Sequence, residues 1–84
     1  MEKLLQRFYS KPVPNDMTFD EIERLAKHYG CRVLTGGNHS QKIVDVKSGT
    51  VIPIPMHGKH IREAYIGELK ELFAEIEARN KGGE

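Results

Sequence analysis

Residues 41–56 read QKIVDVKSGTVIPIPM. Apolar and β-branched residues fill Gln41–Val46 and Val51–Met56, and Ser48-Gly49 lies between the two runs. Runs of this kind are typical of strands, and a short connection that contains glycine joins the two strands of a hairpin. The stretch therefore predicts a β-hairpin, and the rest of the sheet must be built around it.

Two prolines indicate where the second strand of this hairpin lies. Pro53 and Pro55 are two residues apart, so their missing N–H groups fall on the same side of the strand. A central strand needs donors on both sides, which places Val51–Met56 at an edge of the sheet. We expect it to bond to its partner strand through Ile52 and Ile54. The prolines also block that edge against other chains.

The residues before the hairpin predict a helix and a third strand. Thr18 is a good N-cap, and Glu21 completes a capping box with it. The apolar spacing then predicts a helix over Phe19–Tyr29, with Gly30 as its left-handed C-terminal cap. Arg32–Thr35 is short and apolar enough for a strand.

Both ends of the chain predict further helices. Met1–Ser10 has apolar residues at helical spacing and predicts a short helix. The last helix is predicted over Arg62–Ala78, with residues 80–84 as a frayed tail. Its apolar stripe consists of Ile61, Tyr65, Leu69, Leu72, Phe73 and Ile76. Gly67 inside it indicates either a close backbone approach or a weak first turn.

These elements together predict an α+β fold in a single domain, residues 1–84. Residues 1–16 form an N-terminal extension with the extra short helix, and residues 17–79 form the core. The core order is α-β-β-β-α, with a three-stranded antiparallel sheet and both helices on one face. This architecture resembles the double-stranded-RNA-binding domain, although architecture alone does not give a function.

Charge is distributed unevenly along the chain. The whole chain has a net charge of +1, yet the segment from Cys31 to Arg62 carries five basic residues and one acid, Asp45. The basic residues are Arg32, Lys42, Lys47, Lys59 and Arg62. A basic surface attracts phosphates, but an ordinary solvated sheet face explains the same pattern equally well.

Cysteine usage and hydropathy restrict the compartment. Cys31 is the one cysteine, so no intramolecular disulfide forms, which is typical of a reducing compartment. We expect it to be a small buried side chain rather than a nucleophile. Residues 1–9 lack the apolar run of a secretory signal, and no run reaches membrane-spanning length. We therefore expect a cytoplasmic protein that does not enter a membrane.

The stretch Gly36-Gly37-Asn38-His39 is the one best suited to chemistry. Glycines let the backbone approach a ligand closely, and histidine exchanges protons near neutral pH. Three roles are open to His39: general acid or base, metal ligand, or structural residue. A metal site has little support, because no histidine–carboxylate spacing such as H-E-x-x-H occurs.

RNA cleavage requires few protein groups, because RNA carries its own nucleophile, the 2′-OH. A base, an acid and some cations suffice. We expect His39 to act as the base or the acid, and Lys42, with Lys59 or Arg62, to hold phosphate. His57 is a candidate acid or phosphate contact, and a hydrogen bond that caps its loop is the alternative interpretation.

Taken in order, these motifs resemble the HicA family, the messenger-RNA interferase toxins of bacterial type II toxin–antitoxin pairs. Gly37-Asn38-His39 lies where the family has Gly-Ser-His, so Asn38 replaces a serine. Ile52–Gly58 resembles the family's Ile-Pro-x-His-Gly segment. Ser40 and Ala64 also differ from the residues common there.

The resemblance implies a double-stranded-RNA-binding-like fold and metal-independent cleavage of mRNA without a cofactor. It implies that His39 is the catalytic residue, and we expect Gly37 and Asn38 beside it to contact RNA. It also implies neutralisation by a HicB antitoxin that covers the His39 site. The chain would then be a monomer or one part of a toxin–antitoxin hetero-oligomer.

Two other functions are compatible with the sequence. The first is a catalytically inactive module of the same fold that binds RNA or an antitoxin. The second is a purely structural partner subunit. An inactive module binds RNA without cleaving it, whereas a structural subunit has no salt-dependent affinity for RNA.

Overall fold

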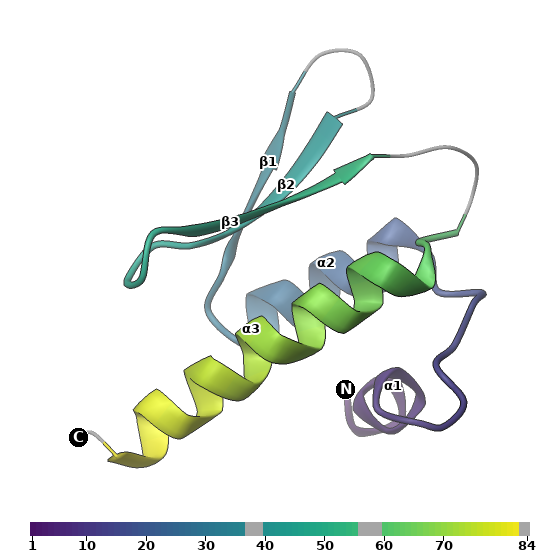
Figure 1. The fold of residues 1–84 in the computed structure, drawn as a ribbon, viewed down its shortest axis with the longest axis horizontal. Helices are drawn as coiled ribbons and strands as arrows, with labels where there is room; N and C mark the ends of the chain where they lie inside the picture. The colour runs from purple at the N-terminus through teal and green to yellow at the C-terminus, as the bar shows by residue number, and fades with distance from the viewer. Residues whose placement is uncertain (37–39, 56–59, 83–84) are drawn as a thin grey trace.

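The computed structural model describes residues 1–36, 40–55 and 60–82, including all of their side chains except those of Ser40 and Gly82. The chain has an α+β fold, and the element order agrees with the prediction (Figure 1). The elements are α1 (Glu2–Phe8), α2 (Phe19–His28), β1 (Arg32–Thr35), β2 (Ser40–Asp45), β3 (Thr50–Pro55) and α3 (Glu63–Gly82). Within the described ranges, none of the helices has both the length and the apolar composition needed to cross a membrane.

The sheet is antiparallel with the order β1-β2-β3, so β3 lies at an edge as the prolines predict. Its register pairs Ile43 with Ile52 and Lys42 with Pro53. Hydrogen-bonded and non-bonded pairs alternate in such a ladder. Since proline has no N–H, the bonded positions on β3 are those of Ile52 and Ile54. Both hairpin strands begin one residue earlier than predicted, and β2 also ends one residue earlier; Met56, the predicted end of the second strand, lies outside the described residues.

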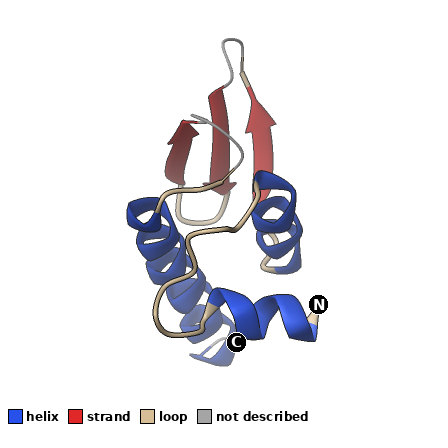
Figure 2. Cartoon of the chain, turned by 90° about the vertical axis from the view of Figure 1, so that its right-hand side faces the viewer, coloured by secondary structure: helices blue, strands red, loops and turns tan. Residues whose placement is uncertain are grey.

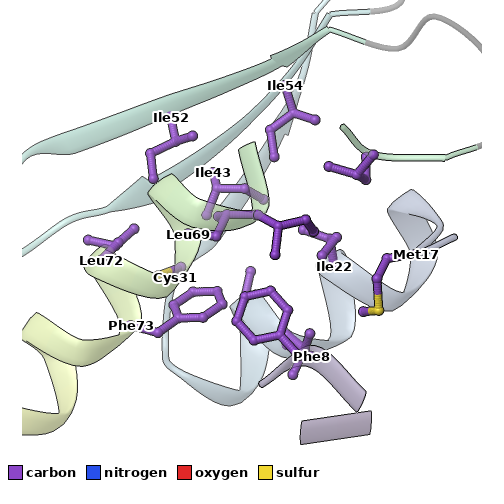
Figure 3. Close-up of a cluster of buried hydrophobic side chains, with 14 of the residues drawn as sticks. Phe8, Met17, Ile22, Cys31, Ile43, Ile52, Ile54, Leu69, Leu72 and Phe73 are labelled. Carbon is purple, nitrogen blue, oxygen red and sulfur yellow. The ribbon is translucent and has the colours of Figure 1, made fainter. Parts of the chain in front are cut away.

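All three helices lie on one side of the sheet (Figures 1 and 2). Ile43, Ile52 and Ile54 are buried on this side, and Figure 3 shows them facing side chains of the helices such as Leu69. Alternate residues point to the opposite face, where Val51 is about half exposed. The sheet therefore has one face in the core and one face in contact with solvent.

The α2 boundaries follow from its caps. Thr18 Oγ1 accepts a hydrogen bond from the Glu21 N–H at 3.4 Å, and Glu21 Oε1 accepts one from the Thr18 N–H at 2.9 Å, which confirms the capping box. Gly30 has a φ of +80°, the left-handed conformation expected just beyond a helix end. The helix itself ends at His28, and Tyr29 is its C-cap residue.

The N-terminal extension contributes to the core. The Phe8 side chain is fully buried, and its ring centroid lies 5.6 Å from that of Phe73 in α3. The Tyr9 and Tyr29 hydroxyls are 2.9 Å apart, and Arg7 forms ion pairs with Asp16 and Glu21. These contacts attach α1 to both of the other helices.

Helix α3 differs from its predicted bounds at both ends. It begins at Glu63, one residue late, and continues to Gly82, four residues beyond the predicted end at Ala78. The reason lies in β2: the Arg79 guanidinium donates hydrogen bonds of 3.0 and 3.2 Å to the Asp45 carboxylate. This contact joins residues 34 positions apart and stabilises the last turns of the helix. A local sequence pattern cannot predict it.

Gly67 in α3 does not mark a close backbone approach. A Cβ placed on this residue would have no heavy atom within 4 Å outside its own helix turn, so this interpretation of the glycine is wrong. The residue adds backbone entropy to the unfolded chain and provides no packing in return. Gly49 also has open space around it, but its φ of +77° is one that other residues rarely adopt.

We therefore expect Gly67→Ala to raise the free energy of unfolding by about 1 kcal/mol, the difference in helix propensity between the two residues. Urea denaturation measures this change. The matched control is Gly49→Ala, which should lower the same quantity by roughly 1 kcal/mol because alanine is strained at positive φ. A destabilised Gly67→Ala protein would contradict the open environment of this site.

Candidate functional site

The residues singled out from the sequence fall into two groups. Lys42 and Arg62 are described, and both are exposed. The others lie outside the described residues, and their predicted roles stay predictions. They are Gly37, Asn38, His39, His57 and Lys59.

One flank of each undescribed segment lies at the same end of the sheet, whereas His60, on the other flank of the second segment, is paired with Thr18. Ser40, which follows His39 in the chain, is paired with Pro55 at the end of β3. Thr35, the last residue of β1, is paired with Gln41. Thr35, Ser40 and Pro55 thus mark one end of the sheet, which we call the loop end. The segments that carry His39 and His57 are both joined to it.

Lys42 lies on the exposed face of the sheet, two residues from Ser40. Its partners on the neighbouring strands are Leu34 and Pro53, both uncharged and exposed. Among the described residues it forms no ion pair. An ammonium group without a carboxylate beside it is available to a phosphate that approaches this face.

A small hollow of about 210 Å³ lies next to the loop end. Its lining residues come from β2, β3 and α3 and are Gln41, Lys42, Pro53, Ile54, Pro55 and Tyr65. The Thr35 hydroxyl donates a 2.9 Å hydrogen bond to Gln41 Oε1, which fixes the orientation of that amide. The hollow is large enough for a small polar group.

Tyr65 is a lining residue that sequence reasoning missed. It was predicted only as part of the apolar stripe of the last helix, and it is half-buried against the core as that pattern requires. Its position beside Lys42 depends on how α3 packs across the sheet. Helical spacing alone does not contain this information.

Arg62 is exposed just before α3, but it does not line the loop-end hollow. The segment before it is held by the residues that precede α2: the Ile61 N–H donates to the Met17 carbonyl at 2.8 Å, and His60 forms a β-bridge with Thr18. The structure therefore does not bring Arg62 into one group with Lys42.

Asp45, the acid of the basic segment, does not offset the exposed cations. Its side chain is buried and receives hydrogen bonds from Arg79 and, at 2.7 Å, from the Ser48 hydroxyl. The Arg79 guanidinium holds the pKa of this carboxyl below its usual range. The pair has no net charge and the Asp45 carboxylate is buried, so Asp45 does not neutralise Arg32 and Lys42 on the exposed sheet face.

Cys31 is buried, as expected, and burial raises the pKa of its thiol to about 11. The thiol is protonated at neutral pH and is not a nucleophile. In the part of the chain that is described, no three His, Cys, Asp or Glu side chains lie close enough to hold a metal ion. The His28 and His60 side chains are exposed.

Comparison with known proteins found no matching family model, no matching curated protein and no matching solved structure.

The Asp45–Arg79 pair gives a pH-dependent prediction. A carboxyl whose pKa is lowered by folding stabilises the protein above its unfolded pKa, ~3.9, and loses this contribution as pH falls through the folded value. We expect Asp45→Asn to lower the free energy of unfolding by about 1–3 kcal/mol at pH 7. The difference from wild type should shrink towards zero at acid pH.

Urea denaturation at pH 7 and at acid pH measures both quantities. The matched control is Asp20→Asn, which removes an exposed carboxylate that forms no ion pair among the described residues. Its effect should be smaller. Equal destabilisation by Asp45→Asn at both pH values would show that the charge of Asp45 is not what stabilises this end of the fold.

Proposed function

We propose that this chain is a small RNA endonuclease, the messenger-RNA interferase toxin of a type II toxin–antitoxin pair of the HicA kind. One observation carries the proposal: the register joins the segments with His39 and His57 to the same end of the sheet, next to the exposed Lys42. A base, an acid and a cation are the groups that metal-independent RNA cleavage uses, and these segments and Lys42 supply candidates for all three.

The proposed reaction uses the 2′-OH of the substrate as nucleophile. His39 takes the proton of the 2′-OH, and the oxygen attacks the adjacent phosphorus. The bond to the 5′-oxygen of the next nucleotide breaks, and that oxygen takes a proton from a general acid, for which His57 is the candidate. The products are a 2′,3′-cyclic phosphate and a free 5′-OH. Lys42, with Lys59, offsets the charge that develops on the phosphoryl oxygens; Arg62, expected from the sequence to share this role, does not line the hollow beside Lys42.

The partner in this proposal is a HicB-like antitoxin that covers the loop end. A partner strand cannot extend the sheet along the outer side of β3, because Pro53 and Pro55 have no N–H to donate there. Occlusion of the site therefore fits the fold better than strand addition at this edge. The proposed substrate, mRNA, places the protein in the cytoplasm.

The alternative is a catalytically inactive RNA-binding or antitoxin-binding module of the same fold. The residue that favours it is Asn38, which stands where the family has a serine directly before the histidine. This alternative and the proposed nuclease both predict RNA binding. They differ in whether the RNA is cut.

The replacement His39→Ala tests the nuclease. We expect the rate of RNA cleavage to fall by about 10²–10⁴-fold, the usual contribution of a general acid or base, and growth arrest on expression to be lost. Gel analysis of a labelled RNA measures the rate. The matched control is His60→Ala, because His60 is an exposed histidine on the segment before α3 and is paired with Thr18. Equal cleavage by wild type and His39→Ala would rule out this catalytic role.

A pH–rate profile separates the base from the acid. A protonated imidazole cannot accept the 2′-OH proton, so cleavage should fall as pH drops below the ordinary histidine range, ~6.5. If His57 is the acid, His57→Gln should also remove the decline on the alkaline side. A wild-type profile without an acid limb would mean that no histidine base limits the rate. An unchanged alkaline limb in His57→Gln would exclude His57 as the acid.

A further inference from the structure

A second and larger hollow, about 550 Å³, lies at the opposite end of the sheet from the loop end. The residues around it come from the start of β1, the turn after β2, the end of α2 and the last turns of α3. Its lining residues are His28, Tyr29, Gly30, Arg32, Asp45, Val46, Lys47, Ile76, Arg79 and Asn80. We call it the distal hollow.

The distal hollow is positively charged. Asp45 is its one lining acid, and this carboxylate is taken up by Arg79. Arg32 and Lys47 are exposed, and neither forms an ion pair within the described part of the chain. Two cations therefore face the hollow without a carboxylate partner.

Lys42 connects the distal hollow with the loop end. The register pairs Lys42 with Leu34 and Val44 with Arg32, so Lys42 and Arg32 are diagonal neighbours across β1 and β2. Such neighbours are about 7–8 Å apart and lie on the same face of a sheet. This is the face that no described helix covers (Figure 2). Lys42 and Arg32 thus lie next to each other on the exposed face, and Arg32 and Lys47 both line the distal hollow at the far end of the sheet.

Another depression among the described residues has the opposite charge. It is a groove of about 270 Å³ between β3 and α3, and it is lined by Glu68, Glu71 and Glu75 together with Leu72 and residues of β3. A polyanion is repelled from this groove and attracted to Lys42, Arg32 and Lys47. The charge distribution therefore defines one route for a phosphate backbone from the loop end.

We propose that the distal hollow binds a backbone phosphate of the single-stranded RNA whose cleaved phosphate lies at the loop end, and that Arg32 and Lys47 hold it. This proposal rests on the proposed function. Ser40–Asp45 spans five residue steps, or about 17 Å at the rise of a strand. A stacked nucleic-acid strand has one phosphate per ~3.4 Å, so about five nucleotides separate the two positions.

The double variant Arg32→Gln/Lys47→Gln tests the site. The probe is a 12-nucleotide RNA with 2′-O-methyl groups, which has no free 2′-OH and cannot be cleaved by the proposed reaction. Each lost phosphate contact lowers the slope of log affinity against log salt by about 0.7 for a single strand. We expect the slope for the double variant to be shallower than that for wild type by about 1.4. Between 50 and 200 mM salt, wild type should therefore lose about sevenfold more affinity than the variant.

The matched control is Lys3→Gln/Arg24→Gln, which removes two exposed cations from α1 and α2 that do not line the hollow. It should keep the wild-type slope, and urea denaturation of both double variants checks that they fold. A second probe is a trinucleotide of the same chemistry, which is too short to span the two positions. Wild type and Arg32→Gln/Lys47→Gln should bind the trinucleotide equally.

The outcomes separate this proposal from the proposed function. If wild type binds the 12-mer and Arg32→Gln/Lys47→Gln keeps the slope of the control, the distal site is overturned and RNA binding stands. If Arg32→Gln/Lys47→Gln weakens binding of the trinucleotide as much as binding of the 12-mer, the proposal that one RNA strand spans the sheet is overturned. If wild type shows no salt-dependent affinity for RNA, both the proposed function and the distal site are overturned.

Discussion

The structure depends on the burial of one face of a three-stranded sheet. Ile43, Ile52 and Ile54 contact the helices, and burying each such side chain contributes about 1.5–3 kcal/mol. Side chains along a strand alternate between the two faces of the sheet, so Lys42, which precedes the buried Ile43, must face solvent. A slip of one residue would exchange Lys42 with Ile43 and place a charge in the core. The exposure of Lys42 is thus a consequence of the same constraint that forms the core.

The prolines of β3 add a second constraint that connects the fold with its contacts. They leave β3 able to bond on one side only, which fixes β2 as its partner and closes the outer edge. The edge of β1 carries no proline, and its exposed face carries Arg32. The two edges of the sheet therefore differ: β3 lies beside an acidic groove, whereas β1 borders the basic hollow.

Local patterns predicted most of this fold. The capping box of α2, the strand Arg32–Thr35 and the edge position of the proline strand depend on residues close in sequence. The end of α3 and the burial of Asp45 depend on a contact between Asp45 and Arg79, and helical periodicity does not report a partner 34 residues away. The same limit applies to the site. The basic segment could be counted from the sequence, but Tyr65 and the distal hollow arise only when α3 packs across the sheet.

The net charge of the chain is only +1, but the local positive charge on the exposed sheet face is what a polyanion encounters. A nearly neutral molecule exerts little attraction over long range, and at 0.1 M salt charges are screened beyond about 10 Å. What acts on an RNA strand is therefore the local arrangement of charges. Lys42 and Arg32 are diagonal neighbours on the exposed face, and the backbone positions of such residues lie about 7–8 Å apart, which is less than the screening distance, so both charges act on the same stretch of phosphates. The acids of α3 lie on another side of the molecule and lower the net charge without occupying the cationic face. Segregation of charge, rather than an excess of one sign, is how a chain of this composition can present a surface to phosphate.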